Sequence, residues 1–529
     1  MTSRLQRMVI VGDGLGAWMT AAALARTVRL EDYSIRVIGL VEADGGLTPR
    51  NAADATLPSP NQEHASIELD EATLVADSDA AFTFGIALSG WSGTGTTYFH
   101  PFGSVGAALG PLPFHQLVMR LRREGIPMRL ANYSLAALAA QAGRFARPDG
   151  NPRSVLSTCR YGMHLDCAAL RDTLRHEAEV AGIVRGPACF SQVEQAADGS
   201  IAAVTTGDGQ RVLGDLFIDC TGAAARLIGS IPEAGWQDWS AWLPCNRVLT
   251  AMIDRSQTPP PYSHAEAHPA GWIRHLPMQG RTFLCGYWSA DLSSEEGMLA
   301  RLREATGSRG LSNAQSATLR FGRRRQAWHR NCIALGSAAA LIDPVGVTNL
   351  QLLRSAIERL MKLLPGGRLC KAEAAEYNRL TEMQLDRARD FATLHYKLNG
   401  RAGEAFWDAC RAMDVPSSLE YKMNLYRSRG RIAMYDEEPL EDVSWANLYD
   451  EHGVRPQSYS PIANGFAVAE LKAYAERARA IMIDELGRMP RHGDYLARLK
   501  AENGCRGSAD APAPRKTRHR VGRFMGDSA

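Results

Sequence analysis

Apolar and polar positions divide the chain into a mixed first part and a helical second part. Up to about residue 362, short apolar runs predict strands at 8–11, 34–42, 214–219 and 332–335. Residues 18–26 have helical composition, and apolar positions at helical spacing predict another helix over about 350–364. Beyond residue 363 the spacing is helical, with few breakers over 374–398 and 467–489. The pattern predicts an α/β fold that ends in a helical region.

One short stretch alternates strictly. In residues 79–91, DAAFTFGIALSGW, Phe82, Phe84 and Ile86 alternate with smaller residues, beginning with Thr83. A period of two is typical of a strand with one face buried. We therefore predict a single half-buried strand at the edge of a sheet.

A glycine-rich turn follows the first predicted strand. Residues 12–17 read GDGLGA, which fits the pattern G-x-G-x-x-G/A between a strand and a helix. Gly12 permits the tight turn, Gly14 lets a pyrophosphate approach the backbone, and Ala17 lets helix and strand pack closely. The second strand ends at Glu42, an acid placed to bind a ribose hydroxyl. This order of elements predicts a dinucleotide site with its pyrophosphate at a helix N-terminus.

Two later segments indicate which dinucleotide is bound. The run 214–229 ends a strand in Asp219-Cys220-Thr221-Gly222, and the strand at 332–335 leads through Gly336-Ser337 to a loop around Asp343 and Pro344. The helix after this loop offers a second N-terminus for an anion. Segments so far apart in the chain favour a large flavin-binding domain over a simple NAD-binding fold.

Composition excludes several classes of protein. The chain has 529 residues and a net charge of +3, far from the basic excess of a nucleic-acid binder. No run of about 20 apolar residues predicts a membrane span, and the ten cysteines form no C-x-x-C pair that would indicate zinc or disulfides. We expect a cytoplasmic protein with reduced thiols, without a metal and without a nucleic-acid or membrane partner. The first lysine in the chain is Lys362.

Taken in order, these motifs resemble the flavin-dependent tryptophan halogenases and, more broadly, the FAD monooxygenase fold. GDGLGAWM is similar to the family's opening G-G-G-x-A-G-W-M, and ADATLP (53–58) to its flavin strap G-E-A-T-x-P. YFHPFG (98–103), LFIDCTG, NCIALGSAAALIDPVGVTNL and SWANLYDEHGVRPQSYSP also follow in family order. The resemblance extends from Val9 to about Leu496.

The resemblance implies a cofactor and a reaction. In the family, reduced FAD comes from a separate flavin reductase, and oxygen and chloride or bromide are used to form hypohalous acid. A lysine positions this electrophile beside an aromatic substrate, and a glutamate stabilises the cationic ring and accepts its proton.

The sequence departs from this pattern at three positions. Thr83 stands where the family's F-K-x-G-I segment has its lysine, and Gly346 stands where E-P-L-E-S-T-x-I has its catalytic glutamate. Misalignment does not explain Thr83, because no lysine precedes Lys362. The third motif, W-x-W-x-I-P, keeps its frame from Trp272 to Pro277, but Arg274 replaces its second tryptophan.

The resemblance assigns site residues by position. Thr83 and Gly346 take the catalytic positions, His100 lies near the passage between flavin and substrate, and Phe102 and Trp445 face the substrate. The residues expected to bind the cofactor are Gly12, Gly14, Leu15, Gly16, Ala17, Glu42, Asp54, Ala55, Ser337, Asp343, Pro344, Thr348, Asn349 and Leu350.

The predicted architecture has three parts. Residues 1–362 form an FAD/NAD(P)-binding Rossmann-like domain into which a substrate-facing β-sheet is inserted, at roughly 87–160 and 230–325. Residues 363–500 form a helical subdomain, and residues 503–529 form a basic disordered tail.

Three functions remain open. The first is an FAD-dependent oxidoreductase that acts on an indole, a phenol or a tryptophan-containing peptide by a mechanism without the lysine and glutamate. The second is a non-catalytic flavin-binding partner or regulatory paralogue of a halogenase. The third is a degenerate protein that binds no flavin.

Overall fold

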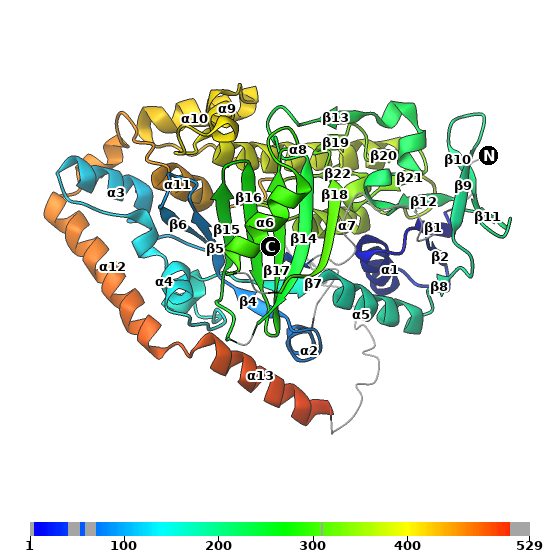
Figure 1. Ribbon diagram of the computed structural model, residues 1–529, viewed down its shortest axis with the longest axis horizontal. Helices are drawn as coiled ribbons and strands as arrows, with labels where there is room; N and C mark the ends of the chain where they lie inside the picture. Colours follow the sequence, from blue (N-terminus) through cyan, green and yellow to red (C-terminus); the bar gives the residue numbers. More distant parts are fainter. Residues whose placement is uncertain (1–4, 41–52, 59–69, 256, 308–309, 508–529) are drawn as a thin grey trace, which may run out of the picture.

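The computed structural model describes residues 5–40, 53–58, 70–255, 257–307 and 310–507. It is a mixed α/β structure built around two large sheets (Figure 1). None of its described helices is both long and apolar enough to cross a membrane.

The first large sheet is the Rossmann-like sheet. It has six strands in the order β20-β21-β12-β1-β2-β8, all parallel to their neighbours except β20. Their bounds are β1 Arg7–Val11, β2 Ser34–Ile38, β8 Val184–Arg185, β12 Leu216–Asp219, β20 Trp328–His329 and β21 Cys332–Ala334. The central strands are apolar because both faces of the sheet are covered. Helix α1 (Leu15–Thr27) packs on this sheet and against α5 (Cys167–Val180).

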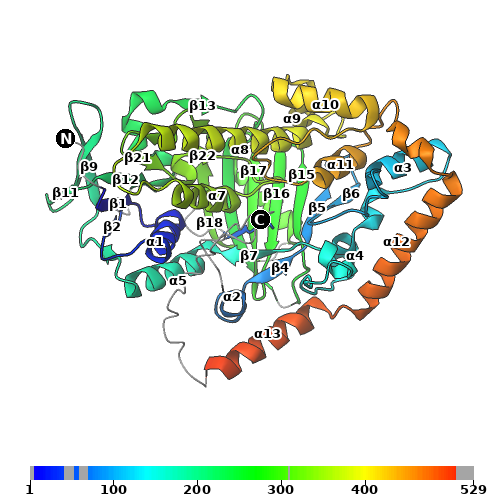
Figure 2. The same cartoon turned by 180° about the vertical axis from the view of Figure 1, so that it is seen from behind.

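The second large sheet has seven strands in the order β18-β14-β17-β16-β15-β5-β6. Their bounds are β5 Gly85–Ser89, β6 Thr97–Pro101, β14 Arg247–Asp254, β15 Ser263–His268, β16 Gly271–Pro277, β17 Arg281–Trp288 and β18 Ser312–Thr318. Neighbours are antiparallel except β15 and β5. Helix α6 (Glu295–Ala305) packs on one face, and α8 (Lys371–Lys397) crosses the other (Figures 1 and 2).

Three small sheets join these layers. They are β9-β10-β11 (Phe190–Gln195, Ile201–Thr206, Arg211–Leu213), β3-β7-β4 (Ala53–Ala55, Gly162–Asp166, Ala81–Thr83) and β13-β19-β22 (Trp236–Asp238, Gly322–Arg324, Ala340–Leu341). The remaining helices are α2 Glu71–Asp77, α3 Phe114–Arg123, α4 Leu135–Gln141, α7 Asn349–Lys362, α9 Ala405–Ala412, α10 Ser417–Arg429, α11 Asp442–Glu451, α12 Val468–Arg488 and α13 His492–Gly507. Helices α12 and α13 run along one side of the molecule (Figure 1).

The predicted fold class is confirmed: the chain combines a Rossmann-like sheet, a second sheet whose strands come from 85–101 and 247–318, and a C-terminal region of helices. The segment expected to be a tail from residue 503 begins inside α13, which continues to Gly507. The stretch AEN at 501–503 has no proline to interrupt the helix that precedes it. Residues 508–529 lie outside the described part of the chain.

The prediction of one half-buried strand over 82–86 is wrong. The stretch belongs to two strands, β4 and β5, which lie in different sheets and separate at Phe84. Gly85 has φ +157°, and a Cβ there would lie 2.2 Å from the carbonyl oxygen of His100, so only glycine lets the chain change sheets here. Both faces are covered, and every residue from Ala81 to Leu88 is buried.

Candidate functional site

The glycine turn after β1 has the geometry of an anion site. Gly12 has φ +140°, and a Cβ at this residue would lie 2.4 Å from the carbonyl oxygen of Cys220. Gly14 precedes α1 with no side-chain cap, so the first N–H groups of the helix are free to bind a ligand. A Cβ on Gly14 would have no atom within 4 Å. Ala17 is fully buried, as close packing of helix and strand requires.

A cavity of about 430 Å³ opens above this turn. Its walls include seven residues that the sequence predicts to hold the cofactor, namely Gly14, Leu15, Gly16, Asp54, Ser337, Asn349 and Leu350. Sequence reasoning missed the walls that α5 and α8 contribute, among them Cys167, Arg171, Tyr377, Thr381 and Gln384. The size is that of a small-molecule site, and two helix N-termini, those of α1 and α7, meet it.

The strap segment is fixed to the start of α7. The backbone N–H of Leu350 donates to Asp54 Oδ2 at 3.1 Å, and the Thr348 hydroxyl donates to the carbonyl of Ala55 at 2.7 Å. Thr348 also caps the helix through the N–H of Gln351. Asn349 closes the preceding loop with two hydrogen bonds to the backbone of Ile342. Thr348 and Asn349 therefore shape the loop that borders the cavity.

Arg274 completes this arrangement. Its guanidinium is buried and donates to Asp54 Oδ1 at 2.8 Å, so that Asp54 accepts both from Arg274 and from the first turn of α7. Pairing with a carboxylate is what makes the burial of an arginine tolerable. The sequence indicates that Arg274 departs from the tryptophan of the family motif, but it gives no sign of its partner.

Asp343 lies behind the cavity wall. Neither Asp343 nor Pro344 lines the cavity. The Tyr396 hydroxyl donates to Asp343 Oδ2 at 2.6 Å and accepts a hydrogen bond from Trp272 Nε1 at 3.0 Å. Burial raises the pKa of Asp343 to about 7, although the bond from Tyr396 opposes this shift. The side chain of Asp343 thus bonds to α8 and lies outside the lining of the cavity.

Thr83 is buried at the end of β4. Its hydroxyl donates to the carbonyl of Gly85 at 3.0 Å, and β4 pairs with β7 so that Thr83 lies opposite Gly162. The hydroxyl is therefore satisfied within its own turn. No titratable group stands at this position.

Gly346 faces an aromatic ring. A Cβ on this residue would lie 2.5 Å from Cε1 of Phe391 and 3.5 Å from Nε2 of His395. Real Cβ atoms do not approach a ring this closely, and Phe391 is fully buried in α8. The space into which a glutamate side chain would leave position 346 is thus filled by Phe391.

Two residues predicted near the substrate, His100 and Trp445, pack against the same ring. The Phe391 centroid lies 5.6 Å from that of His100 and 5.1 Å from that of Trp445. Burial lowers the pKa of His100 to about 4, and among the described atoms its Nε2 has no hydrogen-bond partner. Phe102 is 5% exposed and lies in the same apolar cluster. The Lys422 ammonium, whose charge is paired with Glu438, lies 3.9 Å from the centre of the Trp445 ring.

Of the other predicted cofactor residues, Ala55 forms part of β3 and Glu42 lies outside the described residues. The structure thus brings seven of the fourteen predicted cofactor residues around one cavity, and Gly346, His100 and Trp445 around Phe391. Thr83 belongs to neither group by any described contact.

Comparison with known proteins identifies the family of the chain. The family model for tryptophan halogenase matches residues 7–468. BrvH, a flavin-dependent halogenase from Brevundimonas sp. BAL3, is 33% identical with a TM-score of 0.87, covering 94% of this chain and 99% of that one. Xcc4156, a flavin-dependent halogenase from Xanthomonas campestris, is 31% identical with a TM-score of 0.88, covering 97% and 100%.

The similarity extends to tryptophan halogenases. The tryptophan 6-halogenase ThaL of Streptomyces albogriseolus is 26% identical over 453 residues, which are 81% of this chain and 83% of ThaL. The chain therefore belongs to the tryptophan halogenase family, a family of flavin-dependent enzymes.

Proposed function

We propose that the chain is an FAD-dependent oxidoreductase that takes reduced flavin from a separate reductase and acts on an aromatic substrate without the lysine–glutamate pair. The observation that carries this proposal is the contrast between two sites: a nucleotide cavity with open glycines, and a catalytic position, Gly346, closed by Phe391. Indoles, phenols and tryptophan-containing peptides are the substrate classes we expect.

The cavity fits FAD by its donors. The backbone N–H groups after Gly14 would hold the pyrophosphate, because they are uncapped and the helix dipole favours an anion. The N-terminus of α7 provides a second polar edge beside Asn349 and Leu350. Bound FAD would supply the electrons for the reaction with oxygen.

The protein would act on the substrate by positioning and by excluding water. Thr83 has no amine with which to hold an electrophile, and Gly346 has no carboxylate with which to accept a ring proton. A substrate ring that is already activated can react without these groups, because its own substituent stabilises the cationic intermediate and a water molecule can accept the ring proton. Phenols and indoles have this property, which is why they head the list of substrates.

The test starts from the holoprotein. We would reconstitute the purified chain with FAD, add a flavin reductase and NADH, and screen indoles, phenols and tryptophan-containing peptides with chloride or bromide by mass spectrometry. A product in which halogen replaces hydrogen, or one that gains an oxygen atom, supports the proposal. Absence of FAD binding in both redox states would refute it.

A second function is favoured by the same closed site. If Phe391 keeps substrates out altogether, the chain is a flavin-binding partner or regulatory paralogue of a catalytic halogenase. A tight flavin complex with no turnover across the panel would support this function. Restored turnover on addition of an active relative would separate a partner from an inert protein.

A further inference from the structure

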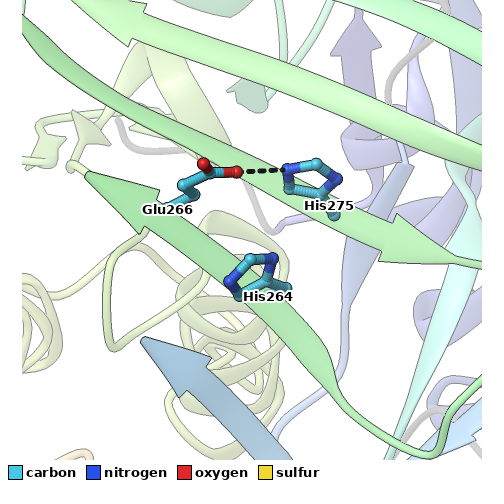
Figure 3. Close-up of side chains that lie close together, drawn as sticks. All are labelled: His264, Glu266 and His275. Atoms are coloured by element: carbon cyan, nitrogen blue, oxygen red, sulfur yellow. Dashed lines mark ion pairs between the residues drawn. The ribbon is translucent and has the colours of Figure 1, made fainter. Parts of the chain in front are cut away.

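A group of three side chains lies on the sheet face opposite the one that α8 crosses. His264 and Glu266 are two residues apart on β15, and His275 lies directly opposite His264 on β16. Successive side chains of a strand point to opposite faces, so these three share one face while Trp272 and Arg274 point to the other. Figure 3 shows the three side chains converging above the two strands.

The three side chains are close enough to share an ion. One ligand atom from each lies within 4.8 Å of the other two, and Glu266 Oε2 is 3.6 Å from His275 Nε2. A tetrahedral zinc ion, with bonds of about 2.0–2.1 Å, holds its ligand atoms roughly 3.4 Å apart. The Glu266 side chain is 42% exposed, so it can rotate to close the remaining gap.

The two histidines supply a type of ligand atom that divalent transition metals favour. A neutral imidazole binds such metals through one of its ring nitrogens. The Nε2 atom of His275 is buried, and among the described atoms it has no hydrogen-bond partner. A bound cation would lie at bonding distance from this nitrogen, whereas Glu266 Oε2 lies 3.6 Å from it.

A further residue is placed to orient one ligand. The Ser89 hydroxyl on β5 lies 2.8 Å from His264 Nε2 and 2.9 Å from the hydroxyl of Thr97 on β6. Metal-binding histidines are generally held by such a contact on the second ring nitrogen. Ser89 therefore leaves Nδ1 of His264 free to face the group.

We propose that His264, Glu266 and His275 bind a divalent transition metal of the zinc class. Two imidazoles and one carboxylate supply three protein ligands, and the half-buried position leaves the fourth to water. The ion would fasten β15 to β16 and, through Ser89, to β5. It would do so without contact with the FAD cavity, which lies on the other side of the sheet.

The experiment uses the full chain without a histidine tag, stripped of metal with a chelator. Zn²⁺ is titrated by calorimetry, with an expected stoichiometry of one and a dissociation constant of about a micromolar or tighter. Glu266→Gln should weaken binding at least ~10-fold and His275→Gln should abolish it, whereas Ser89→Ala should weaken it about 10-fold. His176→Gln, at an exposed histidine of α5, is the matched control.

Two further measurements guard against misfolding. Zn²⁺ should raise the Tm of the wild type and of His176→Gln by a few degrees, and leave that of His275→Gln unchanged. FAD affinity should be the same in the wild type and in Glu266→Gln, which shows that the variant is folded. The proposal is overturned if the wild type binds no stoichiometric Zn²⁺, or if Glu266→Gln and His275→Gln bind it as the wild type does.

Discussion

Two glycines show how differently the surroundings of the cofactor cavity and of position 346 are built. A Cβ on Gly14 would meet no atom within 4 Å, because the space beside it belongs to the cavity. A Cβ on Gly346 would lie 2.5 Å from the ring of Phe391. One glycine leaves room for a ligand, whereas the other leaves room for the protein's own side chain. The absence of a side chain is therefore a sign of a binding site only where the surrounding atoms leave the space open.

The largest loss of stability and of FAD binding is expected from a substitution at Gly12, in the glycine turn after β1. Gly12→Ala places a Cβ against the carbonyl of Cys220 at a positive φ, and should cost about 3 kcal/mol or more and abolish FAD binding. Thermal unfolding and flavin fluorescence titration measure the two losses. Gly14→Ala is the control: it should keep the Tm and weaken only FAD binding, and equal losses in both variants would contradict the assignment of the cavity.

The space beside Gly346 can be opened by replacing Phe391. Phe391→Ala should destabilise the protein by about 3–5 kcal/mol by leaving a cavity, and Gly346→Glu alone should destabilise it through the clash. Combined, the two changes should cost less than the sum of the single effects, with a coupling of about 0.5–3 kcal/mol, because the new side chain takes the vacated space. Denaturant unfolding of the four proteins measures this coupling, and strict additivity would refute the contact.

Adding Thr83→Lys to that double variant tests catalysis. If Phe391 is what blocks the family's mechanism, halogenation should rise in the triple variant and stay at the basal level in Thr83→Lys/Gly346→Glu. Product yield under identical reductase and halide conditions gives the comparison.

Arg274 pairs with Asp54 at the cavity wall, and its loss should have an intermediate effect. Arg274→Met leaves Asp54 without its charged partner, which should cost about 3 kcal/mol, near the lower end for a broken buried pair because Asp54 is 13% exposed. FAD should bind more weakly, since Asp54 lines the cavity. Arg274→Lys, which keeps the charge, is the control; unchanged FAD affinity in Arg274→Met would show that the strap does not depend on this pair.

The smallest effect concerns pH. Because burial raises the pKa of Asp343 to about 7, the folded state holds a proton there that the unfolded state loses near pH 4. Its contribution to stability is complete below about pH 4 and is lost as pH rises through about 7. Asp343→Asn should therefore be more stable than the wild type by at least about 1 kcal/mol at pH 8, and this gain should shrink toward pH 5.

The pKa of the nearby His100 shifts in the opposite direction, so the pH dependence of the wild type alone does not isolate Asp343. The wild type must be compared with Asp343→Asn at each pH. Burial lowers the pKa of His100 to about 4, and that group favours stability as pH rises from about 4 to its unfolded value. Denaturant unfolding of both proteins at pH 5, 6, 7 and 8 isolates the contribution of Asp343. If the difference in unfolding free energy between the two proteins is constant from pH 5 to pH 8, the raised pKa of Asp343 is refuted.

What could be predicted from the sequence depended on how local its cause is. The glycine turn and helices α8 and α12 follow from neighbouring residues, and the structure places them within a few positions of the prediction. The separation of β4 from β5 at Phe84 could not be predicted from neighbouring residues, because it depends on the carbonyl of His100 on another strand. The pairing of Arg274 with Asp54 and the position of Phe391 beside Gly346 are equally non-local.

One missed group did leave a local signal. Residues 263–277 read SHAEAHPAGWIRHLP, in which His264, Glu266 and His268 alternate with alanines on a strand and His275 follows after a short turn. The alternation alone places several metal-binding side chains on one face. Only the pairing of β15 with β16 shows that His275 joins them.

Phe391 also decides how a glutamate at position 346 could be acquired. With Phe391 in place, the new side chain would meet the ring and lower the stability of the protein. Loss of the ring alone would leave a cavity in the core and lower the stability as well. A glutamate at this position is therefore reachable by single substitutions only through a first step that destabilises the protein, whichever change is made first.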